Sequence, residues 1–161
     1  MKYVYIGKIV NTHALKGEVR LISNFEFKEK VFVKNSVLYV GNEKEKLKIE
    51  STRKHKKFDM VKFYSIDTIG DALKYKGCNA YFNEEDLKLE ENEILISDLV
   101  NYEVYNNNNF VGKITEYRSD NGNNMVRVNE KYIPYNSNFI DKYDKINKRI
   151  YFHDIGAFLW E

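Results

Sequence analysis

Hydrophobic and polar residues alternate along most of the first half of the chain, a period of two that predicts strands. The alternation at the N-terminus assigns Ile6 and Ile9 to opposite sides of one extended segment. It resumes at Val19 after a Lys-Gly break, which predicts a hairpin. Further strands are expected at 37–40, 46–52, 59–65 and 78–82. Six strands around one core favour a small closed barrel, because closure leaves no exposed edge.

A short helix is expected between the last two of these strands. Thr68 and Asp71 have the spacing of a capping box, and Gly77 can end the helix in a left-handed conformation.

The second half is also rich in strands, expected at 102–105, 110–117, 125–128, near Tyr132 and at 149–153. Asparagines 106–109 predict a tight turn because Asn tolerates positive φ. Pro134 cannot donate a ladder hydrogen bond, so we expect it at a strand end or edge. An apolar tail follows at 158–160. The chain is therefore predicted to be all-β.

Residues 83–92 are acidic and lack apolar periodicity, which is typical of a linker. We therefore expect two domains, 1–82 and 94–161, joined by a linker at 83–93. The net charge of +2 divides at the same place. Residues 1–82 carry 17 Lys and Arg against 9 Asp and Glu, and residues 83–161 carry 9 against 15. This asymmetry indicates a basic module for nucleic acid and an acidic module for a basic protein, although a Lys- and Asn-rich composition weakens the inference.

The sequence gives little indication of catalysis. The three histidines are far apart and accompany no cysteine pair, so no zinc site is expected, and no phosphate-binding glycine loop or nucleophile elbow occurs. We expect no enzyme activity and no cofactor. The single Cys78 and the lack of a long apolar run or leader-like segment favour a cytoplasmic protein without membrane attachment.

One motif is more specific than these patterns. Residues 5–20 read Tyr-Ile-Gly-Lys-Ile-Val-Asn-Thr-His-Ala-Leu-Lys-Gly-Glu-Val-Arg, which closely resembles the opening of the RimM family of ribosome maturation factors. The family has Gly where this chain has Ala14. Segments similar to other family motifs follow in the family's order, at 53–63, 66–77, 93–101, 110–114 and 132–135.

The resemblance implies a translation-factor-like barrel followed by a PRC-barrel. It implies a monomeric, non-catalytic assembly chaperone that binds the head of the maturing 30S subunit. The partners would be 16S rRNA and a head protein, the nineteenth of the small-subunit series. Two alternatives stay open, a small β-barrel enzyme of reductase-like fold and a PRC-barrel adaptor that binds no RNA.

Candidate RNA contacts lie in two turns, because phosphates accept hydrogen bonds from hydroxyl, imidazole and cationic groups. The alternatives are a purely structural first turn and a solvated charged loop. A strand that places Leu47 inward and lysines 44, 46 and 48 outward would extend the second turn into one continuous basic patch. The candidates are Thr12, His13, Lys16, Arg20, Arg53, Lys54, Lys56 and Lys57.

For the ribosomal protein, the resemblance points to the segment after the linker. The family's paired tyrosines are replaced here by Ile94 and Leu95, while Asp98 and Leu99 match. We expect these four residues to form an apolar patch beside a carboxylate. The alternative is that the aliphatic pair serves only as packing.

Overall fold

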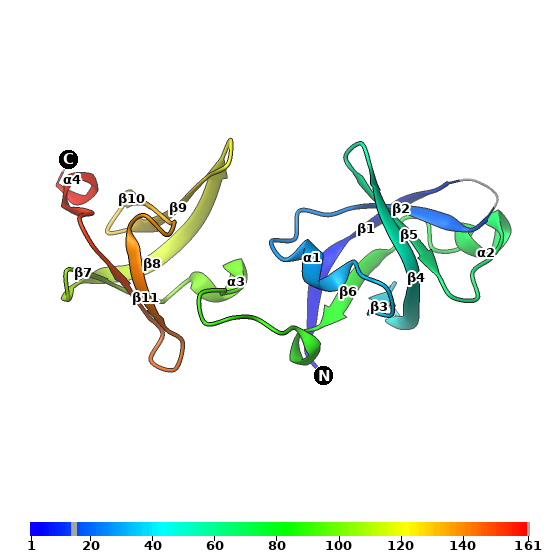
Figure 1. Ribbon diagram of the computed structural model, residues 1–161, viewed down its shortest axis with the longest axis horizontal. Helices are drawn as coiled ribbons and strands as arrows, with labels where there is room; N and C mark the ends of the chain where they lie inside the picture. The colour runs from blue at the N-terminus through cyan, green and yellow to red at the C-terminus, as the bar shows by residue number, and fades with distance from the viewer. Residues whose placement is uncertain (14–15, 161) are drawn as a thin grey trace. The chain divides into compact units, whose positions relative to one another are not determined.

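The computed structural model describes residues 1–13 and 16–160, which fold into two compact units, Met1–Lys88 and Leu89–Glu161 (Figure 1). Each unit contains a six-stranded sheet, which confirms the all-β prediction. The division between the units falls inside the segment expected to be a linker, and the 3-10 helix η1 (Glu84–Asp86) precedes it. Divided at this point, the first unit has 18 Lys and Arg against 12 Asp and Glu, and the second has 8 against 12.

The first unit is a closed barrel with strand order β1-β2-β5-β4-β3-β6. The interior is aliphatic and aromatic, with Leu21, Leu38, Ile49 and Phe63 among its fully buried side chains. The strands are β1 (Tyr3–His13), β2 (Glu18–Ile22), β3 (Val37–Val40), β4 (Glu45–His55), β5 (Phe58–Phe63) and β6 (Asn79–Asn83).

Strand β1 corrects one expectation. Ile6 and Ile9 are both buried in the same core cluster, although simple alternation placed them on opposite sides. The pairing of β1 with β6 shifts register between Tyr5 and Gly7. Such a bulge adds one residue to the strand and reverses the alternation beyond it.

Two short helices accompany this barrel. Helix α2 (Ile69–Leu73) begins as predicted, because the Thr68 hydroxyl accepts a hydrogen bond from the Asp71 backbone N–H at 3.0 Å. Gly77 has the expected positive φ of +85°, but it does not end α2, because the helix already ends at Leu73 with Lys74 as its C-cap in the right-handed region. Helix α1 (Lys28–Val31) was not predicted, because its four residues are too few to show a helical period.

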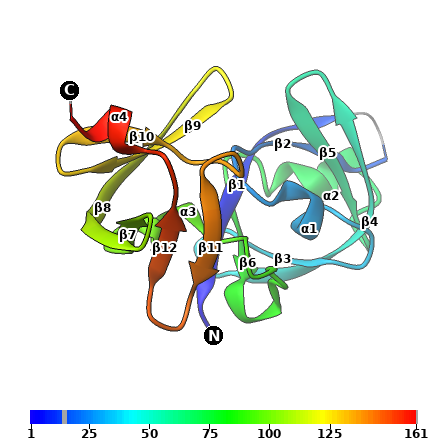
Figure 2. The same ribbon diagram turned by 60° about the vertical axis from the view of Figure 1, so that its left-hand side comes forward.

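The second unit has strand order β10-β9-β8-β7-β12-β11, in which β7 and β12 run parallel (Figure 2). Pro134 is the last residue of β10, an end strand, in agreement with the prediction. Helix α3 and strand β11 were not predicted. The elements are α3 (Ile96–Leu99), β7 (Glu103–Asn106), β8 (Asn109–Asp120), β9 (Asn123–Val128), β10 (Lys131–Pro134), β11 (Ile140–Asp144), β12 (Arg149–Phe152) and α4 (Gly156–Leu159).

Candidate nucleic-acid and protein interfaces

The basic residues of β2 and β4 meet on the outer surface of the first barrel. In the sheet, Arg20 and Arg53 lie on either side of Met60, each directly opposite it. Cross-strand partners share a face, so both arginines cover the same residue of β5. Met60 is fully buried although it is absent from the interior cluster, which is consistent with burial beneath these two side chains.

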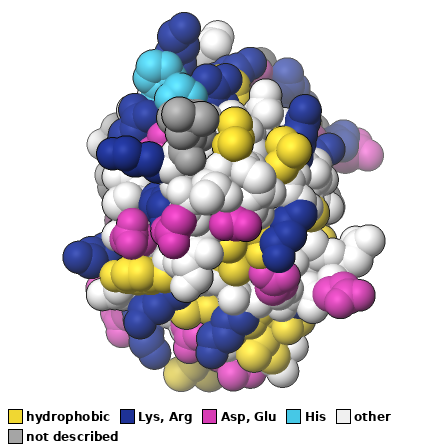
Figure 3. Space-filling view, turned by 90° about the vertical axis from the view of Figure 1, so that its right-hand side faces the viewer, with side chains coloured by type: hydrophobic (Ala, Val, Ile, Leu, Met, Phe, Trp, Pro, Cys, Tyr) yellow, Lys and Arg dark blue, Asp and Glu magenta, His cyan; other side chains and the backbone are white. Residues whose placement is uncertain are grey.

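Aromatic rings complete this surface. The Arg20 guanidinium carbon lies 5.5 Å from the ring centroid of Phe58, and the Lys57 ammonium lies 5.6 Å from it. Nη2 of Arg20 lies 2.8 Å from Nδ1 of His13. The ring centroids of His13 and His55 are 6.0 Å apart. Figure 3 shows histidine side chains surrounded by Lys and Arg on this face. We call the set His13, Arg20, Arg53, His55, Lys56, Lys57 and Phe58 the basic cluster.

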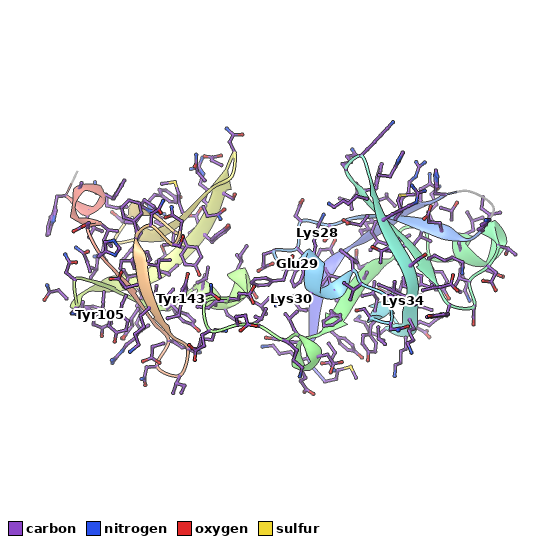
Figure 4. The ribbon with its side chains drawn as sticks, in the orientation of Figure 1. Lys28, Glu29, Lys30, Lys34, Tyr105 and Tyr143 are labelled. Atoms are coloured by element: carbon purple, nitrogen blue, oxygen red, sulfur yellow. The ribbon has the colours of Figure 1, made fainter. Side chains whose placement is uncertain are left out.

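Two of the candidate cations already have acidic partners. Arg53 donates two hydrogen bonds to the Glu18 carboxylate, at 3.0 and 2.8 Å, and this pairing raises the pKa of Arg53. The Lys54 ammonium lies 3.6 Å from Asp59, which also accepts a 2.8 Å hydrogen bond from Lys28 on α1 (Figure 4). Asp59 is buried, so both pairings partly neutralise a charge that would be costly alone.

The other candidates of the first unit are more available. Lys56 and Lys57 are exposed at the tip of the β4–β5 hairpin, where Lys56 takes a positive φ of 56°. Lys16 is exposed in the turn after β1, while Thr12 is a strand residue opposite Val19. Ala14, the departure from the family motif, lies outside the described residues.

The expected basic patch is interrupted along β4. Lys44 precedes the first residue of β4, whereas Arg53 and His55 lie at its last residues. At roughly 3.3 Å per residue, the two groups are separated along most of an 11-residue strand. Glu50 lies between them and pairs with Lys62 at 3.8 Å. The lysines near the start of β4 therefore belong to a different surface.

The apolar patch expected after the linker is largely buried. Ile94 and Leu99 are 7% and 0% exposed and belong to the core of the second unit, and Leu95 is 3% exposed. Only Asp98 of the four candidates is exposed. The expectation of an exposed apolar patch is therefore corrected. The physical reason is that α3 is a single turn, too short to be stable alone, so it is held in place by the burial of Leu99 and of Ile94 and Leu95 just before it.

The exposed Phe and Trp side chains of the second unit lie instead near its C-terminal helix, whereas exposed Val100 and Ile146 lie elsewhere in the unit. Phe110 and Trp160 are 57% and 86% exposed and line one groove together with Asn107, Val111 and Leu159. Phe110 also contacts the ring of Tyr105, with 5.6 Å between centroids. The sequence showed the apolar tail at 158–160, but nothing in it indicated that Phe110 would lie beside that tail.

Within residues 1–13 and 16–160, no group of three or more His, Cys, Asp or Glu side chains has the arrangement of a metal site. The same residues include no helix long and apolar enough to cross a membrane. In the first unit, burial and a hydrogen bond to Glu45 raise the pKa of Tyr75 above its ordinary value.

Comparisons with known proteins agree with the sequence motifs. A protein-family model described as the RimM N-terminal domain matches residues 4–87. Ribosome maturation factor RimM of Streptococcus thermophilus is 37% identical over 136 residues, covering 81% of this chain and 79% of the relative. The factor of the same name from Staphylococcus haemolyticus is 37% identical over 155 residues, covering 91% and 93%.

Two solved structures are also similar. One is a Pseudomonas aeruginosa 16S ribosomal RNA processing protein RimM, with TM-score 0.45 and 17% identity, covering 98% of this chain and 100% of that one. The other is the N-terminal domain of RimM from Thermus thermophilus, with TM-score 0.48 and 21% identity, covering 55% and 98%.

Proposed function

This chain belongs to the RimM family of ribosome maturation factors, and from that premise we propose that it binds the maturing 30S subunit and promotes 16S rRNA maturation without catalysis. The first unit would contact 16S rRNA in the subunit head. The second unit would contact the basic head protein that is nineteenth in the small-subunit series.

The observation that carries the proposal is the basic cluster. Arg20 and Lys57 are both held against the ring of Phe58, and Lys56 projects from the neighbouring turn. Phosphate groups accept hydrogen bonds from such cations whatever the base sequence. The Glu18 carboxylate holds Arg53 in one orientation through two hydrogen bonds, so Arg53 supports the surface while the hairpin lysines supply unpaired charge.

For the second unit, charge and shape support a protein partner. Its acidic balance would attract a basic protein over a distance, and this effect weakens as salt rises. Large exposed aromatic side chains such as Phe110 and Trp160 are typical anchors of protein interfaces. Asp98 adds an exposed carboxylate, while Ile94, Leu95 and Leu99 would act indirectly by holding α3 in place.

Binding alone is sufficient for such a role. A factor that binds one arrangement of the head rRNA more tightly than others raises the population of that arrangement. The size of this shift is limited by the difference in affinity between the arrangements. Release must follow maturation, so moderate and salt-sensitive affinity is expected.

The test is a double charge reversal in the hairpin, Lys56→Glu with Lys57→Glu. These side chains are exposed, so the free energy of unfolding should change by only about 0.5 kcal/mol per site. Binding to purified 30S precursors should weaken, and the salt dependence should become less steep by roughly one unit of slope per lost phosphate contact. Lys34→Glu with Lys76→Glu is the matched control, because it makes the same change in net charge at two other exposed lysines of the first unit.

The outcome separates the candidate functions. Weakened binding by the hairpin variant, with the control variant close to wild type, supports contact with RNA through the basic cluster. Equal binding by all three proteins would favour an adaptor that recognises only a protein. Alanine substitution of Trp160 and Phe110 would then be expected to abolish the remaining binding.

A further inference from the structure

Four tyrosines form a continuous row on the outer face of β1, β6 and β3. Tyr81 of β6 lies directly opposite Tyr5 on one side and Tyr39 on the other. Tyr3 precedes Tyr5 by two residues and therefore shares its face. Its ring centroid lies 5.2 Å from that of Tyr39 and 6.3 Å from that of Tyr81, and the centroids of Tyr5 and Tyr81 are 5.9 Å apart.

The row is open to solvent. Tyr5 is 53% exposed and Tyr3 is 39% exposed, whereas Tyr39 is covered. Neighbouring rings meet edge to face, at 62° to 73°, so the rings are not paired face to face with one another. Free ring surface therefore remains at Tyr3 and Tyr5, where a flat ligand could stack.

A lysine is fixed beside this ring surface. The Lys44 ammonium lies 4.3 Å from the ring centroid of Tyr81 and 5.7 Å from that of Tyr3. The tight β3–β4 turn sets its position, because Lys44 has φ 55° and its backbone N–H donates to the carbonyl of Gly41. Lys46 lies directly opposite Tyr39 in β4 and extends the row by one residue.

Unlike Arg53 of the basic cluster, which pairs with Glu18, these lysines have no acidic partner among the described residues. Among the described residues, no carboxylate forms an ion pair with Lys44, Lys46 or the nearby Lys8 of β1. The neighbouring acidic groups have other partners or lie in the turn. Glu45 accepts a hydrogen bond from Tyr75, Glu84 pairs with Lys2 at 3.2 Å, and Glu43 is exposed in the turn before Lys44.

We propose that this tyrosine row binds a single-stranded segment of RNA, with bases stacked on Tyr3 and Tyr5 and phosphates bound by Lys44 and Lys46. Exposed rings beside unpaired cations are the combination that single-stranded nucleic acid requires, because every base has a flat face and every linkage has a negative charge. Bases in a duplex are already stacked and could not use the rings. A protein partner fits less well, since lysine is depleted from the centres of protein interfaces.

This surface is separate from the basic cluster. In the closed order of six strands, β6 with Tyr81 lies three strands from β5 with Phe58 in either direction. The two strands are therefore on opposite sides of the barrel. The inference rests on the proposed function only for the choice of RNA over DNA, and the two surfaces can be tested independently.

The experiment measures fluorescence anisotropy of a labelled oligoadenylate of about ten nucleotides, a length within the site size of small barrels. The same strand paired with its complement is the duplex control. We expect the full chain to prefer the single strand. Replacing both Tyr3 and Tyr5 with Ala should weaken its binding by about tenfold or more, which corresponds to about 1.4 kcal/mol. Replacing both with Phe should leave affinity within about twofold, because stacking needs the ring and not the hydroxyl.

Two further variants make the result specific. Lys44→Gln should lower the salt slope for the single strand by about 0.7. Tyr64→Ala is the matched control, because Tyr64 belongs to the same unit and is 38% exposed, and it should bind as wild type does. The thermal melting temperature of each variant shows whether it is folded. If the alanine pair does not fold, Lys44→Gln still decides the question, because an unchanged salt slope would count against the proposal.

The proposal would be overturned if the wild-type chain bound duplex as well as single strand. Unchanged affinity of a folded alanine pair would overturn it as well. Either result could occur while the Lys56 and Lys57 reversal still weakened binding to 30S precursors, so failure here is distinguishable from failure of the proposed function.

Discussion

The two units have the same number of strands but differ at the edges of their sheets. In the first unit, pairing of β1 with β6 closes the barrel, and all six strands have neighbours on both sides. In the second unit, β10 and β11 are end strands. Pro134 ends β10, and β11 carries Asp141 and Lys142. Proline and charged side chains at an edge oppose pairing with another chain. A sheet can thus avoid aggregation either by closure or by the composition of its edges.

The interiors differ as well. The first core is formed mainly by aliphatic residues and phenylalanine, whereas the second is bordered by tyrosines 102, 117, 135 and 143. Burial raises the pKa of Tyr102, Tyr135 and Tyr143 above the ordinary value near 10. These buried phenols stabilise the second unit while they are neutral, that is, below the ordinary tyrosine pKa near 10. This contribution should be lost as the pH rises into strong alkali, where the phenols must ionise. In the first unit, by contrast, the tyrosine row lies on the outer surface and not around the core.

The largest expected effect tests whether the units unfold independently. Leu99→Ala should lower the free energy of unfolding of the second unit by about 2 to 5 kcal/mol, because Leu99 is fully buried and a cavity would remain. Hydrogen exchange measured by mass spectrometry should show faster exchange in β7–β12 and unchanged exchange in β1–β6. Val100→Ala is the control, as its side chain is 44% exposed. Faster exchange throughout the chain would show that the two units unfold together.

Replacing one glycine in each unit should cause a smaller loss of stability, and the two losses can be compared. Gly17 and Gly122 both have φ +85°, but a Cβ at Gly17 would lie 2.4 Å from the carbonyl oxygen of Ile66, while one at Gly122 meets nothing within 4 Å. Alanine at either position incurs backbone strain of about 1 kcal/mol or more. Only Gly17→Ala should also displace backbone, so its loss of stability in urea titrations should clearly exceed that of Gly122→Ala. Equal losses would mean that the segment at Ile66 moves aside without cost.

Much of this fold could be predicted because alternation is a local property. The six strands of the first barrel, the Thr68 cap and the position of Pro134 all depend on neighbours in sequence. Strand β11 was missed because Ile140–Asp144 has a single buried apolar residue, and its pairing with β12 supplies what its composition does not. Ile9 was placed on the wrong face because a bulge depends on the partner strand and leaves no sign in the alternation.

The candidate site was predicted less completely, for a related reason. Charge runs such as 53–57 are visible in sequence, but the partners that neutralise Arg53 and Lys54 come from β2 and β5. The burial of Ile94 and Leu99 likewise depends on contacts made elsewhere in the second unit. The tyrosine row joins residues 3, 5, 39 and 81, which only the strand order brings together. The sequence shows where charged and aromatic residues occur, but it does not show which of them are exposed or paired.

The smallest expected effect concerns the turn that joins the end strand β11 to β12. Asp144 accepts hydrogen bonds from the side chain and the backbone N–H of Asn147, at 2.8 and 3.0 Å, and these bonds lower the pKa of Asp144. A lowered folded-state pKa stabilises the fold above the ordinary Asp pKa near 3.9, and this contribution is lost as pH falls through the lowered value. Asn147→Ala removes the side-chain bond, so the variant should be slightly less stable than wild type at neutral pH. The difference should shrink toward zero in strong acid. Urea titrations of both proteins from pH 7 to below 3 would measure it, with Ile146→Ala in the same exposed turn as the control. A difference that does not change with pH would instead indicate that Asn147 acts through the conformation of the turn and not through the carboxylate.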